Sequence, residues 1–297
     1  MKDKLLEVLV CPVSKGELAY DRHNQELTCA DSGLIYSVKE GKPVMLESQA
    51  RKSSIDTSVN YPDRLDVSST SPDKKPQPLL RKMFSFVRTS HTFKTRANKD
   101  RIPQLIKSIK KSEIAINVGA GNTDYCPEII NLDLEATENA DIVADGRSLP
   151  IRTRSVSLVI SQAVLEHTPE TQLNLAEIER VLVNGGILYL EVPFMQPYHA
   201  HPHDYFRFTH KGLISYLDRF DIIEEGISVG PASATSLNLK IFLATLFSFG
   251  NKNLFIIFGV IFGWLTLPLK YFDYFLESNP LSYHSASGIY VLARKKN

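Results

Sequence analysis

Cysteine is scarce in this sequence of 297 residues, which has only Cys11, Cys29 and Cys126. An odd and sparse set of this kind is not a disulfide framework, so we expect a reducing compartment, the cytoplasm. The N-terminus also lacks the long apolar stretch of a secretory signal, because a charged residue interrupts the short run 5–10. These absences argue against a small secreted, disulfide-stabilised protein.

An excess of charge of one sign is lacking as well. The 34 Lys and Arg residues nearly balance the 33 Asp and Glu residues, which leaves a formal net charge of +1. Nucleic-acid-binding proteins usually show a clearly basic face or domain, so we expect no nucleic-acid partner. The content of 43% hydrophobic and 23% charged residues is that of an ordinary globular protein, and the length allows one large and one small domain.

The first part of the chain, residues 1–48, has the pattern of a small, mostly β unit. A short helix is expected at 4–9, followed by turns and by short strands at 17–20, 25–29, 34–38 and 43–46. Residues 49–78 are rich in Ser, Asp, Lys and Pro. They cannot bury enough apolar surface to offset their ordering entropy, so we expect a disordered linker.

The remaining residues, 79–297, alternate between strand and helix patterns. After a basic segment whose isoleucines and leucine at 102–109 have helical spacing, the apolar runs predict strands at 114–118, 129–134, 140–144, 156–161, 187–192, 222–228 and 288–293, with helices at 169–182 and 211–220. This alternation predicts a doubly wound α/β sheet with helices on both faces. Ligands of such sheets bind at the carboxyl ends of the strands.

Glycines and acids stand at those strand ends. Gly119 and Gly121 follow the first strand, after Asn117, and allow a tight turn in which a ligand lies against bare backbone. Asp133 ends the second strand, where a carboxylate can accept two hydrogen bonds from a ribose diol. A turn without a ligand and a solvated strand-end acid are the plainer readings of these two features.

Two further elements follow at the ends of the next strands. Asp145 and Gly146 come after the third strand, where the carboxylate can accept from an exocyclic amine of adenine. Gln162 lies in the segment 161–167 at the end of the fourth strand. A nicotinamide site is disfavoured, because no GxGxxG opens a full helix here.

In this order, the four elements resemble those of class I S-adenosylmethionine (SAM)-dependent methyltransferases. The resemblance covers about 113–230 and the last strand, with "SLPIRTRSVSLVISQAVLEH" and "ERVLVNGGILYLEVP" in the positions of family motifs. It implies a Rossmann-like, seven-stranded sheet and S-adenosyl-L-methionine as the cofactor. It also implies that the cofactor is bound by Asn117, Gly119, Gly121, Asp133, Asp145, Gly146 and Gln162.

This sequence departs from the family pattern in two places. Asn117 stands where the family often has Asp or Glu, so a charge is missing there. The gap from Gly121 to Asp133 is also too short for a full βαβ crossover. The chain is similar to a branch of the family with a shortened first crossover, in which "GxG" is soon followed by "INLD".

The loop 193–209 after the fifth strand is dense in His, Tyr, Asp and Arg. Three readings remain open: a metal site, because three His and an Asp lie close in sequence; a polar surface loop; and substrate binding with proton removal. We favour the last and expect no metal. We expect His199 or His203 to take the proton, and the substrate to be bound by His201, Asp204, Tyr205 and Arg207.

This loop is similar to that of methyltransferases associated with cell-surface polysaccharide biosynthesis. The predicted function is therefore methyl transfer to an oxygen or nitrogen of a small-molecule, glycan or lipid-linked acceptor. The alternative is a non-catalytic SAM-fold scaffold or activator partner, for which the missing charge at Asn117 leaves room.

The N-terminal residues resemble the small zinc-ribbon-like activators of tRNA and protein methyltransferases, and their stand-alone bacterial relatives of the YcaR type. The strings "CPVSKG", "ELTC" and "GLIYSVKEGKPVML" carry the resemblance. Ser14 replaces the second cysteine of the usual CxxC pair, and two cysteines alone cannot complete a tetrahedral site, so we expect no zinc. The resemblance implies a built-in activator; a packing module is the plainer reading.

An apolar insertion at about 237–270 separates the last two strands. Its two apolar segments, 241–249 and 254–269, flank a lysine-bearing turn, and the second contains Trp264 and Pro268. The second run is slightly short of the roughly 20 residues of a spanning helix. We expect a helical hairpin dipping into the cytoplasmic face of the membrane. A hairpin buried in the protein or in a homo-oligomer interface is the competing reading.

Overall fold

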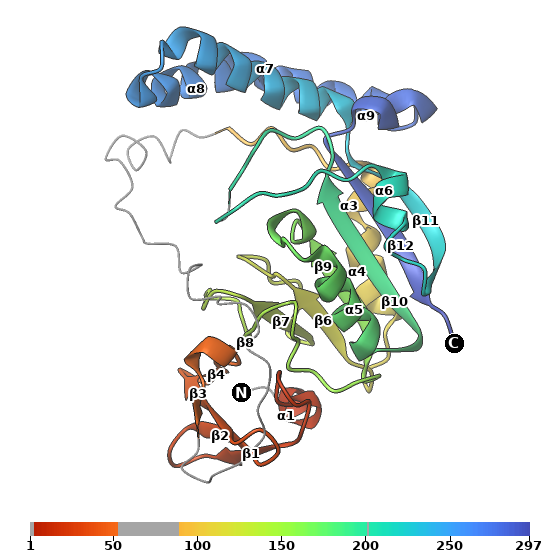
Figure 1. The fold of residues 1–297 in the computed structure, drawn as a ribbon. Helices are drawn as coiled ribbons and strands as arrows, with labels where there is room; N and C mark the ends of the chain where they lie inside the picture. Colours follow the sequence, from red (N-terminus) through yellow and green to blue (C-terminus); the bar gives the residue numbers. More distant parts are fainter. Residues whose placement is uncertain (1–2, 53–88, 201) are drawn as a thin grey trace.

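A computed structural model describes residues 3–52, 89–200 and 202–297. The predicted linker, 49–78, lies for the most part outside these residues, and so does His201. Figure 1 shows three layers along the long direction of the molecule: a small N-terminal unit, a central sheet with its helices, and a pair of long helices.

The N-terminal unit, residues 3–52, begins with the helix α1 (Asp3–Val8) and continues as a small antiparallel sheet. Inward-facing residues alternate along the strands, and those fully buried include Leu27, Cys29 and Tyr36. A 3-10 turn, η1 (Glu47–Gln49), precedes the last strand, which pairs with β3. The strands are β1 (Leu18–Asp21), β2 (Glu26–Cys29), β3 (Leu34–Lys39), β4 (Lys42–Pro43) and β5 (Arg51–Lys52).

The central sheet has seven strands in the order β11-β12-β10-β9-β6-β7-β8. The five strands from β10 to β8 are parallel, while β12 is antiparallel to both of its neighbours. This confirms the predicted Rossmann-like sheet. Its strands are β6 (Ala115–Val118), β7 (Ile129–Asp133), β8 (Ile142–Val143), β9 (Val156–Gln162), β10 (Leu182–Pro193), β11 (Phe220–Val229) and β12 (Gly288–Lys295).

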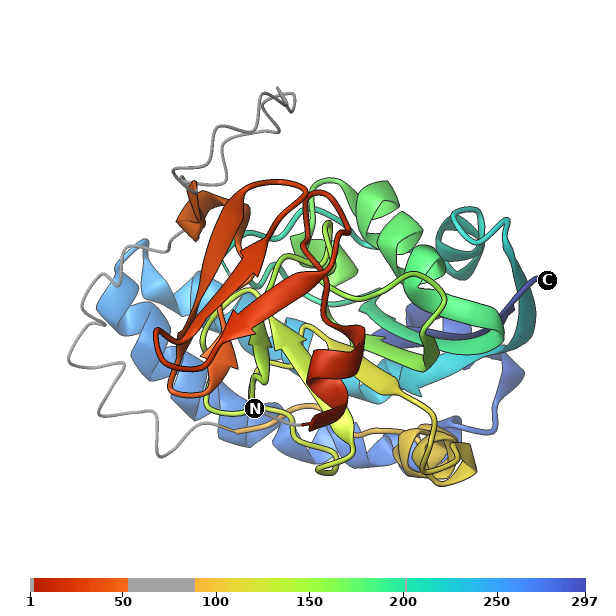
Figure 2. The same ribbon diagram turned by 90° about the horizontal axis from the view of Figure 1, so that it is seen from below.

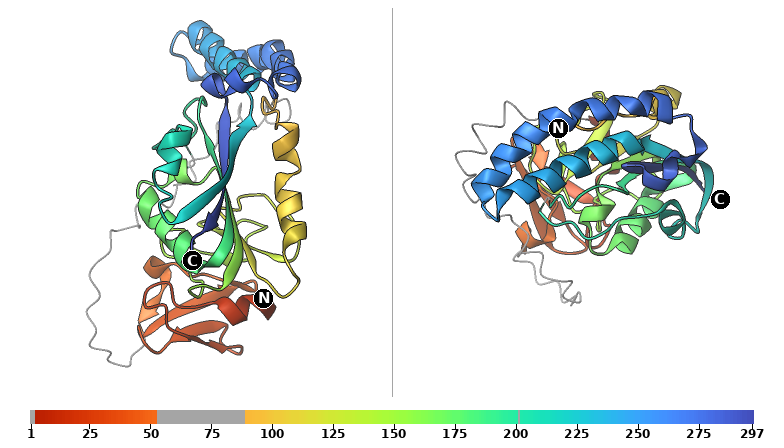
Figure 3. Two further views of the ribbon diagram at one scale, coloured as in Figure 1. Left: turned by 90° about the vertical axis from the view of Figure 1, so that its right-hand side faces the viewer. Right: turned by 90° about the horizontal axis from the view of Figure 1, so that it is seen from above.

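Helices cover both faces of this sheet, as Figure 3 shows. The helix α5 buries Leu175, Ile178 and Val181, whose helical spacing gives it one apolar face. It ends where β10 begins, and β10 then runs through Gly185 and Gly186 with a shift in its register against β9. One face carries α3 (Arg96–Lys99) and α4 (Arg101–Ser108), and the other carries η4 (Leu165–His167), α5 (Thr171–Val181) and α6 (His210–Ile214).

The connection between β6 and β7, residues 119–128, is fully described and contains no helix. The parallel strands are neighbours all the same, because the loop turns sharply at once. The backbone amides of Gly119 and Ala120 both donate to the carbonyl of Leu132, at 2.8 and 3.0 Å. The loop is thereby fixed at the carboxyl end of the sheet.

The N-terminal unit attaches to the β8 edge of the sheet (Figure 2). Val44 forms a parallel bridge with Val143, and the amide of Met45 donates to the carbonyl of Val143 at 2.7 Å. Leu9 forms a second bridge, antiparallel, with Ile151. The buried apolar residues of both parts form one continuous core. The unit therefore covers an edge strand whose amides and carbonyls would otherwise be unpaired.

A helical hairpin is inserted between β11 and β12. Its helices join at Phe249 and Gly250, both in the left-handed region with φ of 48° and 77°, and Asn251 caps the second helix. The fully buried carboxylate of Asp273 accepts from two amides at the start of α7. The elements are α7 (Pro231–Ser248), α8 (Lys252–Thr266), η5 (Leu267–Phe272), α9 (Asp273–Leu276) and η6 (Pro280–Ser285).

Candidate active site

A cavity of about 280 Å³ opens at the carboxyl ends of β6, β7 and β9. Five of the residues predicted to bind the cofactor line it: Gly119, Gly121, Asp133, Asp145 and Gly146. They meet there because the carboxyl ends of parallel strands share one edge of the sheet. The opposite wall comes from the segment after β9 and from the loop before α6.

Gly119 and Gly121 are needed at their positions for different reasons. Both have positive φ, 71° and 54°, which is strained for residues with a Cβ. A Cβ at Gly119 would also lie 2.2 Å from a methyl carbon of Val164, whereas nothing lies within 4 Å of a Cβ at Gly121. Gly119 thus allows the two sides of the cavity to approach, and Gly121 presents open backbone to a ligand.

Asp133 holds the glycine loop and still offers acceptors to the cavity. Its Oδ2 accepts from the amide of Gly121 at 2.7 Å, and its Oδ1 from the amide of Glu135 at 2.9 Å. Each carboxylate oxygen has a second lone pair. The residues therefore fit a bound adenosyl cofactor, with open backbone at Gly121 and free acceptors for its ribose diol.

Replacing Asp133 by alanine is expected to weaken cofactor binding by about 2 kcal/mol or more, since two ribose hydrogen bonds are lost. Calorimetry with S-adenosyl-L-methionine would measure a rise in Kd of roughly 30-fold. Asp124→Ala, which removes an exposed acid of the same β6–β7 connection outside the cavity lining, is the matched control. Equal affinity in folded Asp133→Ala and wild-type protein would contradict the assignment.

The wall that follows β8 is braced by the N-terminal unit. Ser148 donates its hydroxyl to the carbonyl of Pro12 at 2.6 Å. Lys15 donates to the carbonyl of Leu149 at 3.3 Å and pairs with Glu177 of α5 at 2.8 Å. The loop 145–150, which includes Asp145 and Gly146, thus takes part of its support from outside the sheet domain.

Two predicted cofactor residues, Asn117 and Gln162, do not line the cavity. Asn117 is buried between β6 and β7, where its amide donates to the side chain of Asn131 at 3.1 Å. The side chain of Gln162 donates to Glu191 and accepts from Tyr125. The amide nitrogen of Asn117 and both polar atoms of the Gln162 side chain are thus paired within the sheet domain.

The loop between β10 and α6 is held by an internal ion pair. Arg207 binds both carboxylate oxygens of Asp204, at 2.5 and 2.6 Å. The hydrogen bonds from Arg207 lower the pKa of Asp204 to about 2. Arg207 also donates to the carbonyls of Gln196 and Pro197, so this pair, predicted to bind substrate, fixes the loop. Of the other predicted loop residues that are described, His203 and Tyr205 line the cavity.

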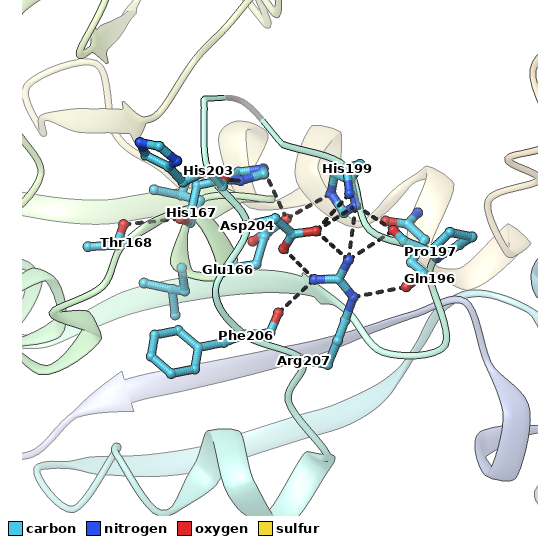
Figure 4. A network of polar contacts seen from close by, with 12 residues as sticks. Glu166, His167, Thr168, Gln196, Pro197, His199, His203, Asp204, Phe206 and Arg207 are labelled. Carbon is cyan, nitrogen blue, oxygen red and sulfur yellow. Dashed lines mark hydrogen bonds and ion pairs between the residues drawn. The ribbon is translucent and has the colours of Figure 1, made fainter. Parts of the chain in front are cut away.

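His199 faces a different group, which the sequence did not single out (Figure 4). Its Nε2 lies 3.7 Å from Oε1 of Glu166, and Nε2 of His167 lies 3.8 Å from the same oxygen. Glu166 is fully buried, and its nearby carboxylate is the main cause that raises the pKa of His199. The signals in the sequence were that Glu166 and His167 lie shortly after the fourth strand and end one of the strings that resemble family motifs.

In the N-terminal unit, Cys11 and Cys29 each lie beside a serine. The thiol of Cys11 is 3.4 Å from the hydroxyl of Ser32, and the thiol of Cys29 is 3.3 Å from the hydroxyl of Ser14. Two serines thus stand beside two cysteines, where zinc sites commonly have four strong ligands. The absence of zinc stays a prediction.

Two family models match this chain. One, described as "Trm112p-like protein", matches residues 2–41, and the other, described as "Methyltransferase domain", matches residues 120–190. The UPF0434 protein of Vibrio campbellii is 54% identical over 56 residues, which make up 19% of this chain and 95% of that protein. The UPF0434 protein of Polaromonas sp. is 59% identical over 51 residues, 17% of this chain and 85% of that protein.

Solved structures resemble the chain more loosely. A complex of the Haloferax volcanii Trm112 methyltransferase activator with a methyltransferase aligns at a TM-score of 0.39 and 16% identity, over 68% of this chain and 93% of that chain. A sarcosine dimethylglycine methyltransferase from Galdieria sulphuraria aligns at 0.42 and 11% identity, over 73% and 98%. Both TM-scores are below 0.5, so these likenesses have no bearing on the activity.

The sheet order, the glycine loop and the methyltransferase-domain match together define an enzyme, a methyltransferase that uses S-adenosyl-L-methionine. Through its N-terminal unit, the chain belongs to the family of Trm112p-like UPF0434 proteins. It therefore joins two units in one polypeptide, and the structure packs them against each other.

Proposed function

We propose that the enzyme methylates an oxygen or nitrogen of a glycan or lipid-linked acceptor at a membrane surface. The observation that carries this proposal is the position of the exposed apolar hairpin, which lies over the loop that forms the substrate side of the cavity (Figure 1). Asn238 of α7 donates to the carbonyl of Met195 at the start of that loop, at 3.1 Å.

The chemistry requires alignment and removal of one proton. When bound, S-adenosyl-L-methionine supplies a methyl group on a sulfonium, which needs no further activation. The acceptor atom forms its bond to the methyl carbon while the carbon–sulfur bond breaks and leaves its electrons on sulfur. Holding the two reactants in line supplies much of the rate. His203, which lines the cavity, takes the acceptor's proton.

His199 has a different place in this scheme. It is not among the lining residues, and its ring is directed at Glu166 and Pro197. Of the two histidines considered as the base, we therefore assign proton removal to His203. Tyr205 forms the adjacent wall, with its ring centroid 5.8 Å from that of His203.

The hairpin presents an unusual amount of apolar surface. Among the described residues, the helical segment Lys252–Leu276, which runs from α8 to α9, is the only one long and apolar enough to cross a membrane by length and composition. Only 11% of its apolar 18-residue stretch is buried. One helix of this kind is weak evidence for a span. Large apolar side chains that are more than half exposed here include Phe242, Leu246, Phe249, Ile261, Trp264, Leu265, Phe272 and Phe275.

Burying this apolar face in a lipid surface is more favourable than exposing it to water. Contiguous apolar patches of this kind are rare on monomeric soluble proteins and mark interaction sites. Lys252 starts α8, and Lys270 follows it, so cations flank the apolar stretch as they do in interfacial helices. Trp264 and Tyr271 are amphipathic side chains suited to the headgroup region. The described part of the chain does not bury the hairpin, which leaves a second copy of the chain as the competing occupant.

Phe249→Asp combined with Leu265→Asp is expected to abolish binding to lipid vesicles, because both charges would enter the acyl region. Flotation with vesicles that contain anionic lipid measures the bound fraction. Leu173→Asp on α5 is the matched control, since Leu173 is also 51% exposed but lies outside the hairpin. A discrete oligomer that neither floats nor needs detergent would assign the hairpin to a contact between copies.

The acceptor class is tested by transfer of a labelled methyl group. Full-length protein is incubated with labelled S-adenosyl-L-methionine and with separate lipid-linked and water-soluble glycan fractions. Label in the lipid-linked fraction supports the proposal, and Asp133→Ala serves as the inactive control. Label in neither fraction, with cofactor binding intact, would contradict it.

We further propose that the N-terminal unit acts as a built-in activator. Its contacts with Ser148 and Leu149 brace the wall of the cofactor cavity, and its strand β4 leads directly into the bridge with β8. A unit that orders this wall before the cofactor arrives reduces the entropy lost on binding.

A further inference from the structure

Three side chains that can each offer a ligand atom converge beside the cofactor cavity. The ligand atoms of Glu166, His167 and His199 lie within 4.8 Å of one another (Figure 4). The two Nε2–Oε1 distances, 3.8 and 3.7 Å, are too long for hydrogen bonds. When both rings are neutral, such a group needs a positive charge at its centre, because lone pairs that face each other repel.

The hydrogen bond of His167 fixes the state of its ring. Its Nδ1 lies 2.5 Å from the backbone carbonyl of His203, an oxygen that can only accept. Nδ1 therefore carries the hydrogen, and in the neutral ring Nε2 has a free lone pair. That lone pair is the one directed at Glu166.

The same reasoning applies to His199. Its Nδ1 lies 3.0 Å from the carbonyl of Pro197 and 3.2 Å from Nη2 of Arg207. The two hydrogens of that Nη2 are taken by the carbonyl of Pro197 and by Asp204, at 2.9 and 2.6 Å. His199 Nδ1 is thus the donor to Pro197, and its Nε2 also presents a lone pair to Glu166.

Glu166 makes the arrangement costly without a cation. Its side chain is fully buried, and neither carboxylate oxygen has a hydrogen-bond partner among the residues that the structure describes. A buried carboxylate without a partner is strongly unfavourable. Buried charges in proteins are paired or coordinate metals.

The geometry points to a metal, and we propose that Glu166, His167 and His199 bind one divalent transition-metal ion, Zn²⁺ by preference. In a tetrahedral site with bonds of about 2.1 Å, ligand atoms lie about 3.4 Å apart, close to the separations seen here. Two His and one Glu form a ligand set of catalytic zinc sites, which keep a fourth position open. The carbonyls of His203 and Pro197 orient the two rings as outer partners do in metal sites.

This site departs from our expectation, drawn from the sequence, that the loop holds no metal. The group of three His and an Asp within the loop is not what forms it, since two ligands come from the segment after β9. His167 lines the cofactor cavity, so the ion lies at the cavity wall. If a fourth position of the ion were open toward the cavity, the ion would polarise an oxygen of the acceptor, a role that rests on the proposed function.

Metal binding is tested without reference to activity. Full-length protein, treated with a chelator and dialysed, is titrated with Zn²⁺ by calorimetry and with Co²⁺ by visible absorption. One equivalent should bind, with the d–d bands of a four- or five-coordinate nitrogen and oxygen site and no thiolate charge-transfer band. Glu166→Gln and His199→Asn should each weaken binding by more than about 100-fold, above the usual cost of losing an outer partner. His23→Gln, at an exposed histidine of the N-terminal unit, should bind as the wild type does.

Folding of each variant is checked by its melting temperature and its affinity for S-adenosyl-L-methionine. His199 is 39% exposed at its side chain, so His199→Asn keeps the test decisive if the Glu166 variant does not fold. Wild-type protein that binds neither ion, or ligand variants that bind like the wild type, would overturn the site and leave a proton as the partner of Glu166. Methyl transfer by metal-free protein would mean that the proposed function holds without the metal site. Metal binding by protein that methylates no acceptor would mean that the metal site holds without the proposed function.

Discussion

Leu9→Asp is expected to abolish soluble, cofactor-binding protein. Leu9 is 4% exposed, forms the bridge with Ile151 and belongs to the core shared by both parts of the chain. Burying an unpaired carboxylate costs several kcal/mol, a large share of the roughly 5–15 kcal/mol that stabilise a folded protein. Soluble yield and the melting temperature with and without S-adenosyl-L-methionine measure the effect. Glu7→Ala, at an exposed position of the adjoining helix α1, should behave as the wild type.

Deleting residues 1–52 tests the same interface without introducing a charge. The deletion exposes Ile142, Leu149 and Ile151, all of which are fully buried in the intact chain, and leaves the β8 edge unpaired. We expect a lower melting temperature, aggregation and weaker cofactor binding. A truncated protein with unchanged melting and unchanged methyl transfer would show that the unit is a passenger.

The inner strands of the central sheet could be predicted because they are buried on both sides. They read as short apolar runs, and β6 buries all four of its residues. The predictions were less accurate where neighbours decide the structure. Strand β10 begins at Leu182, before the predicted 187, and passes through two glycines because it pairs there with β9 across a bulge. Helix α6 ends at Ile214, well before the predicted 220.

The cofactor half of the site could be predicted for a related reason. Glycines and acids at the ends of parallel strands must meet at one edge, so the order of motifs already implies their proximity. The substrate half could not be predicted in this way. Glu166 meets His199 only because the loop after β10 folds back over the segment after β9, where the amide of Tyr205 donates to the carbonyl of Glu166 at 2.7 Å. Nothing in the local pattern at either place specifies that contact.

Asn117 shows the limit of carrying a motif over from a resemblance. Its amide nitrogen pairs with Asn131 in the next strand, and its side chain does not line the cavity. The sequence alone does not show whether a polar side chain pairs with a neighbouring residue or with a ligand.

His203→Gln is expected to lower kcat by about 100-fold or more while the affinity for S-adenosyl-L-methionine stays unchanged, because general base catalysis contributes effects of this size. His203 lines the cavity, and its carbonyl is held by His167, so its ring is positioned by the backbone of the loop. Glutamine keeps the polar contacts but cannot take a proton.

The test compares kcat and KM for the acceptor fraction that takes up label, with cofactor affinity measured by calorimetry. His210→Gln is the matched control, because His210 bonds to the carbonyl of Gly226 and lies outside the cavity lining. A rise in KM alone would make His203 a binding residue. A loss of kcat below about threefold would refute its role as the base. Proton removal would then be assigned to solvent, which is sufficient when the acceptor is a neutral amine.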